Sequence, residues 1–225
     1  MLIRYSDLLA LKITTAEAVQ HRVADVLVDD DLTLVYVVAE FRGWLSEGRT
    51  VVRAADFGEP DIGAGTWPTE LAKEDIRPAP EPAARDADNH RAEAEALRAA
   101  GVADASCSVG PGLFDTRASL PAGHIRTLHR LMGAKVSGSD REAGQLLDVL
   151  VDMDARRVTA LVVETGLPVG EHQRVVPVRM LDEPDWAKPE LRLTCPASRV
   201  DESPDLHEVP LERKWWNAVL AYYGL

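Results

Sequence analysis

The chain contains a long internal repeat, which limits its fold to one built from two similar units. The segment at 25–31 reads DVLVDDD, and it returns at 148–154 as DVLVDMD. The segments that follow also match, because VYVVAE ending at Glu40 corresponds to TALVVE ending at Glu164. The two copies lie about 123 residues apart, which is long enough for a whole domain.

The same spacing holds near the end of each copy, where RAEAEALRAAG and KWWNAVLAYYG both close on a glycine. We therefore predict two tandem domains of similar fold, related by internal duplication. The segment between them contains Gly, Pro and Ser without a clear period, as is typical of a linker. The expected boundaries are 1–101 for the first domain, 102–123 for the linker and 124–225 for the second domain.

Each unit has the alternating, β-branched pattern of short strands joined by tight turns. Apolar residues at 23–28 lead into the acidic triplet 29–31, and a second apolar run follows at 34–38. Asp suits such a turn because its carboxylate accepts hydrogen bonds from nearby backbone amides. A further turn is expected at 43–48 and, in the second copy, at 166–170. We predict a mainly β fold in which each small sheet curls into a β-barrel that hides its edges.

After the strands, each unit is predicted to end in a helix. Residues 93–100 are rich in Ala, Glu, Leu and Arg, and Gly101 stands where a C-terminal glycine cap is expected. Residues 212–223 are predicted to form the second helix, with Gly224 as its cap.

Several segments together resemble the PRC-barrel family. They are GWLSEGRTVV from Gly43, the DVLVDD strands, TELAKEDIRPAP from Thr69, PASRVDESP from Pro196 and the final YYG. The resemblance covers nearly the whole chain in two copies and leaves only the central linker outside. It implies a small β-barrel like that of the photosynthetic reaction centre H subunit and of a ribosome-maturation factor. It further implies a binding or scaffolding role, with no catalytic residues to carry over.

The charge and cysteine content exclude several classes of function. A net charge of −12 opposes binding to nucleic acid and to anionic membranes. No apolar run reaches the roughly 18 residues that a membrane span needs, and the start of the chain lacks a signal-peptide pattern, so we expect a soluble, cytoplasmic protein. Cys107 and Cys195 are too few for a zinc site or a disulfide framework and are expected to be reduced thiols. No catalytic, cofactor-binding or metal-binding residues are predicted.

Aromatic residues on the last helix are the main candidates for an interaction site. Trp215 and Tyr222 lie on one apolar stripe with Val219, and the adjacent stripe comprises Trp216, Leu220 and Tyr223. Two interpretations remain open. The stripes pack inside the monomer, between the two barrels, or they form an interface with another subunit or a partner.

A second candidate contact is the hairpin tip that carries Trp44 and Leu45. We predict a non-enzymatic protein-interaction or scaffolding module that binds an unidentified protein or forms a homodimer. One alternative is a ribosome-associated maturation-type factor. Another is a small-molecule-binding protein or enzyme that uses the cleft between the barrels.

Overall fold

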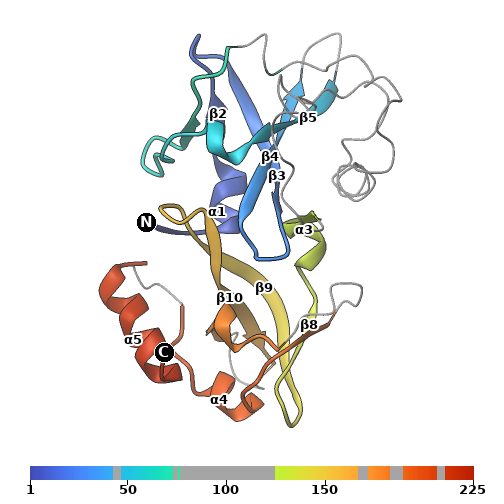
Figure 1. Ribbon diagram of the computed structural model, residues 1–225, viewed down its shortest axis with the longest axis vertical. Helices are drawn as coiled ribbons and strands as arrows, with labels where there is room; N and C mark the ends of the chain where they lie inside the picture. The colour runs from blue at the N-terminus through green and yellow to red at the C-terminus, as the bar shows by residue number, and fades with distance from the viewer. Residues whose placement is uncertain (43–46, 73–75, 77–124, 167–171, 183–189, 207–210) are drawn as a thin grey trace. The chain divides into compact units, whose positions relative to one another are not determined.

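The structure is a computed structural model of the chain, and it describes residues 1–42, 47–72, 76, 125–166, 172–182, 190–206 and 211–225 (Figure 1). It is mainly β, with 47% strand and 21% helix, which confirms the mainly β prediction. The strands form two mixed sheets of six strands each. The chain divides into two compact units: unit 2 is Ser6–His129, and unit 1 is Met1–Tyr5 together with Arg130–Leu225.

The sheet of unit 2 is built around the antiparallel hairpin of β3 and β4, in which Val-rich segments pair along their length. Its strand order is β5-β4-β3-β2-β6, with β6 parallel to β2, and β7 pairs with β3 beside β2. A short helix and a 3₁₀ turn complete this unit. The bounds are α1 Tyr5–Ala10, β2 Lys12–Thr14, β3 Gln20–Val28, β4 Leu34–Arg42, β5 Glu47–Arg53, η1 Ala54–Asp56, β6 Thr66–Pro68 and β7 Arg126–Thr127.

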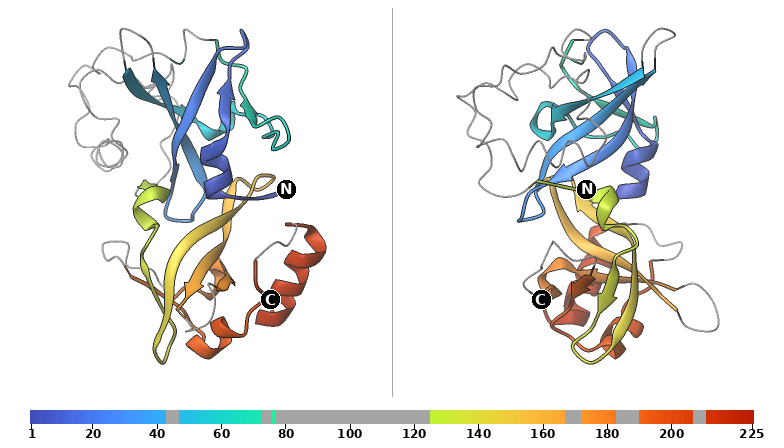
Figure 2. Two further views of the ribbon diagram at one scale, coloured as in Figure 1. Left: turned by 180° about the vertical axis from the view of Figure 1, so that it is seen from behind. Right: turned by 90° about the vertical axis from the view of Figure 1, so that its right-hand side faces the viewer.

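The sheet of unit 1 has the matching order β11-β10-β9-β8-β12, with β12 parallel to β8, and β1 pairs with β9. Figure 2 shows β9 and β10 as one long, twisted hairpin in both of its views. The bounds are β1 Leu2–Arg4, β8 Lys135–Ser137, β9 Glu142–Asp152, β10 Arg157–Thr165, β11 His172–Pro177, η2 Val178–Met180, β12 Glu190–Arg192, α4 Ala197–Asp201 and α5 Arg213–Tyr223, and the short helix α3 Leu128–Leu131 spans the boundary at which the chain passes from unit 2 to unit 1.

The core of each unit centres on the second half of its long first hairpin strand. In β3, the three consecutive residues Val26, Leu27 and Val28 are all 0% exposed, and the corresponding residues 149–151 of β9 are equally buried. Three buried residues in a row mean that both faces of the strand are covered at this point. Burial on both faces explains why strict alternation of apolar and polar residues is lost there.

The first acidic turn has the structure expected from its sequence. The Asp29 carboxylate accepts a hydrogen bond from the Thr33 N–H at 2.8 Å, and the Asp29 N–H donates to the Thr33 carbonyl at 3.0 Å. Leu32 has a φ of 61°, in the left-handed region that tight turns use. In the corresponding turn of unit 1, the Asp152 carboxylate accepts from the Asp154 N–H at 3.0 Å, and Arg156 has a φ of 48°.

The closed barrels expected from the sequence are not present in the part of the chain that the structure describes. Each sheet remains an open path that ends at β5 and β6 in unit 2 and at β11 and β12 in unit 1. The last strand of each path is only three residues long. Across each gap, an isolated bridge joins the segment after the 3₁₀ turn to the residue after the last strand: Phe57 to Thr69 and Leu181 to Leu193. A single bridge is too little pairing to close a sheet.

Each unit includes one short strand from the opposite half of the sequence. β1 belongs to unit 1, where it pairs with β9, although the rest of the first half forms unit 2. β7 belongs to unit 2, where it pairs with β3, although the rest of the second half forms unit 1. The two compact units are therefore not the continuous segments that the repeat predicts.

Several sequence-based expectations concern residues outside the described ranges. They are the linker at 102–123, the first trailing helix at 93–100 and the hairpin tip with Trp44 and Leu45. These expectations, including the domain end at 101, stay predictions.

Candidate functional site

The candidate site is the C-terminal helix α5 and the segments that hold it in unit 1. The helix begins after Glu212, whose carbonyl accepts a hydrogen bond from the Trp216 N–H at 3.0 Å. It ends at Gly224, which has a φ of 75° and donates its N–H to the Ala221 carbonyl at 3.1 Å. A left-handed residue at this position favours glycine because glycine has no Cβ. The predicted helix and its glycine cap are therefore confirmed.

The buried face of α5 takes one residue from each expected aromatic stripe. Val219 is 0% exposed and Tyr223 is 5% exposed, and the helix packs against β11. The two side chains are four residues apart and so share one face of the helix. The side chains that flank this face are half-buried; they are Trp215, Trp216, Leu220 and Tyr222.

Arg199, on α4, contacts and stabilises the C-terminal end of α5. Its Nη2 donates to the Tyr222 carbonyl at 2.9 Å, and the Tyr222 hydroxyl donates to the Arg199 carbonyl at 2.8 Å. The guanidinium lies 5.8 Å from the Tyr222 ring centroid and 5.6 Å from that of Tyr223. A cation at the carboxyl end of a helix is favoured by the helix dipole, and its position over the rings adds a cation–π attraction. These contacts fix the helix at the end opposite its tryptophans.

A strap formed by residues 203–206 runs antiparallel along β11 and supports the same region. Arg174, on β11, donates from Nη1 to the Ser203 carbonyl at 2.7 Å, and the Leu206 N–H donates to the Gln173 carbonyl at 2.8 Å. The Asp205 carboxylate lies 3.1 Å from His172 Nδ1 and 3.9 Å from Arg174 Nη1. Polar contacts therefore hold the strap along the strand.

Four buried polar atoms beside the strap have no hydrogen-bond partner among the residues that the structure describes: Thr165 Oγ1, Arg174 Nε, Ser203 Oγ and the Tyr223 hydroxyl. Burial raises the pKa of Tyr223 above its ordinary value, and the adjacent Ser203 hydroxyl lowers it by a smaller amount. Buried groups of this kind are ordinarily satisfied by water or a small polar ligand.

A hydrogen bond joins the turn between β8 and β9 to the start of α4. The Asp140 carboxylate accepts hydrogen bonds from the Ala197 N–H at 2.7 Å and the Arg141 N–H at 3.0 Å. The Ala197 contact is the main reason why the pKa of Asp140 is lowered. Arg141 Nη2 also contacts Asp201 at 2.6 Å. A Cβ on Gly138 would lie 2.4 Å from the Ala197 backbone nitrogen, so this turn requires glycine.

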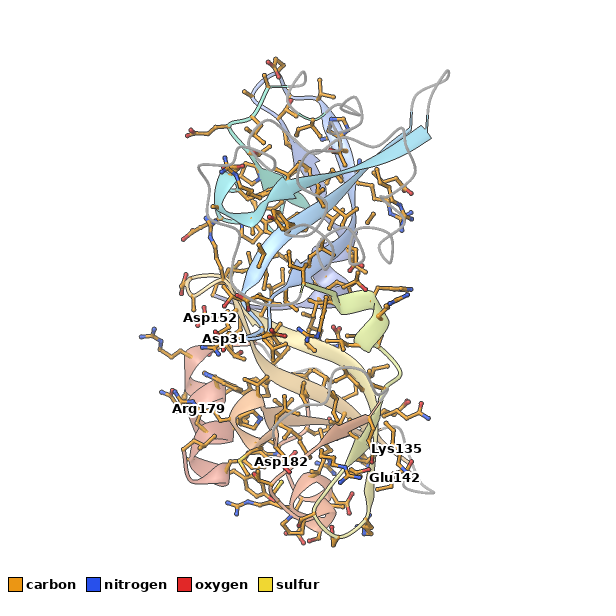
Figure 3. The ribbon with its side chains drawn as sticks, turned by 45° about the vertical axis from the view of Figure 1, so that its right-hand side comes forward. Asp31, Lys135, Glu142, Asp152, Arg179 and Asp182 are labelled. Carbon is orange, nitrogen blue, oxygen red and sulfur yellow. The ribbon has the colours of Figure 1, made fainter. Side chains whose placement is uncertain are left out.

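On the neighbouring surface, Lys135 of β8 and Glu142 of β9 form an exposed ion pair with an N–O distance of 2.9 Å. Figure 3 shows these two side chains next to each other. The hydrogen bond from Lys135 to Glu142 raises the pKa of the lysine. Exposed pairs of this kind contribute little to stability, so we assign it no functional role.

Cys195 is buried and is not in a disulfide, as the sequence analysis expected for this residue. Burial raises the pKa of its thiol. A raised pKa keeps the thiol protonated at neutral pH, and the thiolate is the nucleophilic form. Cys195 therefore has the properties of a core residue.

The two tryptophans of α5 lie together at its N-terminal end. Their ring centroids are 6.5 Å apart and the ring planes are tilted by 38°. Of the six predicted interaction residues, the structure brings Trp215, Trp216, Tyr222 and Tyr223 onto one helix, whereas Trp44 and Leu45 lie outside the described ranges.

The residues that hold α5 in place carry no recognisable sequence pattern. Arg199 lies within the segment PASRVDESP, and Arg174 directly precedes the apolar residues Val175 and Val176, which are typical of an ordinary strand. No local spacing connects either residue to Tyr222 or Ser203. Only the fold brings them together.

The described residues were searched for a metal site and a membrane span, and the chain was compared with known proteins. Within the described ranges, no group of three or more His, Cys, Asp or Glu side chains is placed to hold a metal ion. The helices in those ranges are too short or too polar to cross a membrane. No model of a known protein family matches the chain, and no curated protein matches it.

Proposed function

We propose that this chain is an internally duplicated, PRC-barrel-like protein of the cytoplasm that binds a protein partner through α5 and has no enzymatic activity. The duplication is supported by the two sheets, whose strands follow the same order and the same pattern of parallel and antiparallel pairing. It is also supported by paired positions, because Ile13 opposes His21 in unit 2 as Val136 opposes Gly144 in unit 1.

In each unit, an isolated β-bridge joins the two ends of the open sheet, and this bridge supports a barrel-like fold. Phe57 meets Thr69 in unit 2, and Leu181 meets Leu193 in unit 1. Trp67 fills the space beside Phe57, with ring centroids 4.8 Å apart, and its indole N–H donates to the Gly58 carbonyl at 3.0 Å. A curled sheet with a large residue at its seam fits the resemblance noted from the sequence.

The observation that carries the proposed function is the half-buried pair Trp215 and Trp216 on a firmly held helix. The buried side chains of Val219 and Tyr223 pack α5 against the rest of unit 1, and Arg199 donates a hydrogen bond to its C-terminal end. Interface hot spots are enriched in Trp and Tyr, and a fixed helix loses little entropy when it binds. The net charge of −12 favours a partner with a basic or apolar surface.

The test compares two double variants of α5. Trp215→Ala with Trp216→Ala removes the half-buried rings, and Lys214→Ala with Asn217→Ala changes exposed positions on the same helix. Each tagged protein is cross-linked in the source cell, captured and examined by mass spectrometry, after circular dichroism has shown that both variants are folded.

The proposal requires a partner that the wild type and the Lys214/Asn217 variant both capture and that the tryptophan variant loses at least tenfold. A second copy of the chain is one acceptable partner, and sedimentation analysis identifies that case. If the three proteins capture the same set in equal amounts, α5 is not the interaction site.

A further inference from the structure

The first strand of the chain completes the sheet of unit 1, which the second half of the sequence otherwise builds. β1 pairs antiparallel with β9, so that Ile3 opposes Val151. On the other side of β9, Val158 of β10 pairs with the same Val151. β1 therefore covers an edge of β9 whose N–H and C=O groups would otherwise lack sheet partners.

Side chains of the first five residues add to this pairing. Ile3 and Tyr5 are each 2% exposed. The Arg4 guanidinium donates to Gln173 Oε1 and to the Leu206 carbonyl, each at 3.3 Å. The N-terminal segment thus supports both the sheet of unit 1 and the strap beneath α5.

The reverse contribution is made to unit 2. β7 pairs with the end of β3, and Arg126 forms an ion pair with Asp30 of the following turn. Ile125 is 8% exposed and packs in a core cluster with Leu27, Tyr36, Val38 and Val51. The buried carboxylate of Asp25 accepts a hydrogen bond from the His129 N–H at 3.3 Å.

The two contributions occupy equivalent places. Ile3 opposes Val151 as Arg126 opposes Val28. Arg4 opposes Leu150 in the same way that Thr127 opposes Leu27. The end of β3 therefore has an edge position equivalent to the one that β1 occupies on β9. On β3, this position is occupied by β7. This is the pattern of a strand exchange between two like units.

We infer that the two halves of this chain are obligate partners that exchange their first strands, so that each half completes the sheet of the other. Their association is carried by β1 on β9 and by β7 on β3, and it does not require the covalent connection through 77–124. This inference is independent of the proposed role of α5.

The first test cuts that connection in the folded full-length protein. A protease site is inserted within 102–123, where no described strand pairing is interrupted, and the chain is cleaved to completion. The expected product is a 1:1 complex of the two fragments that elutes with the uncut protein and has their summed mass in native mass spectrometry. Fragments that separate without denaturant would overturn the inference.

The second test identifies the strand that β1 contacts. Leu2 opposes Asp152, so Leu2→Cys with Asp152→Cys reports the exchanged pairing. Leu2→Cys with Asp29→Cys reports the alternative in which β1 returns to β3, because residue 29 is the equivalent of residue 152 in the repeat. Directly opposed residues have Cβ atoms about 4.5–5.5 Å apart, which allows a disulfide after small adjustments. Both variants carry Cys107→Ser, and the buried Cys195 is retained.

After oxidation and cleavage, the exchanged pair should give one band on a non-reducing denaturing gel that becomes two bands after reduction. The Leu2/Asp29 variant should give two bands in both conditions and leave its two thiols free to alkylation. A disulfide in the Leu2/Asp29 variant, or none in the Leu2/Asp152 variant, would overturn the inference even if the cut halves remain together.

Discussion

At the scale of single residues, Tyr222 and Tyr223 are neighbours with opposite hydrogen-bonding situations. The Tyr222 hydroxyl donates to the Arg199 carbonyl at 2.8 Å, whereas the buried Tyr223 hydroxyl has no partner among the described residues. Their rings meet edge to face with centroids 5.0 Å apart. Removal of each hydroxyl therefore has a different expected cost.

We predict that Tyr222→Phe lowers the free energy of unfolding at pH 7 by about 1 kcal/mol, the usual net value of a hydrogen bond. Tyr223→Phe should leave it unchanged or raise it slightly, because an unsatisfied buried hydroxyl is removed. Urea unfolding of both variants measures the difference. A larger loss for Tyr223→Phe than for Tyr222→Phe would contradict the assignment of partners.

The same pair has a predicted pH dependence. Burial raises the pKa of Tyr223 above the ordinary tyrosine value of about 10, so the folded state holds the neutral form more strongly than the unfolded state does. This contribution to stability is fully present below pH 10 and is lost as the pH rises further. Wild type should therefore lose more stability than Tyr223→Phe between pH 9 and pH 11. Parallel curves for the two proteins would show that the Tyr223 hydroxyl is solvated.

At the scale of elements, the start of β9 depends on a glycine that its counterpart in β3 does not need. Gly144 has a φ of 153°, and a Cβ there would lie 2.1 Å from the Glu164 carbonyl oxygen. His21 occupies the corresponding place on β3, opposite Ile13, and is not among the residues with positive φ. The close approach of β9 to β10 is therefore particular to unit 1.

We predict that Gly144→Ala destabilises the protein by about 3 kcal/mol, near the upper end of ordinary substitutions, because the strand must move away from its neighbour. His21→Ala is the matched control, since that backbone already carries a Cβ. Urea midpoints of both variants check this prediction. An unchanged midpoint for Gly144→Ala would mean that β9 and β10 are farther apart than the structure has them.

At the scale of the whole molecule, the exchange of β1 and β7 links the stability of the two units. Unfolding of either half of the sequence removes one strand from the sheet that the other half mainly builds. Each lost strand exposes a sheet edge and uncovers apolar side chains such as Ile3 and Ile125. Units linked in this way are expected to unfold together.

We predict a single unfolding transition that shifts as a whole when either unit is weakened. Val26→Ala and Val149→Ala remove equivalent buried side chains, which are 0% and 1% exposed, from β3 and β9. Each should cost about 2 kcal/mol. Circular dichroism and tryptophan fluorescence should give coincident curves for both variants. A biphasic curve in which only one phase moves would show that the units fold independently.

Local sequence was sufficient to predict the secondary-structure elements, but it was insufficient to predict which elements pair with each other. The strands, the turn at Asp29 and the glycine cap at Gly224 follow from alternation, side-chain hydrogen bonding and backbone freedom, which act over a few residues. The resemblance to a barrel family predicted closed sheets. Closure depends on how many residues pair between the first and last strands of a sheet, and the local sequence does not determine this number.

The exchange of β1 and β7 was decided only by the tertiary structure. The two strands occupy equivalent places, so their own residues do not reveal whether each pairs with its own half or with the other. The contacts of Arg199 with Tyr222 and of Arg174 with Ser203 likewise join segments that no local pattern connects. Sequence by itself determined the repeat, the strands and the aromatic C-terminal helix. Long-range packing determined which surfaces those elements complete, because the free energy of pairing depends on neighbours brought together only by folding.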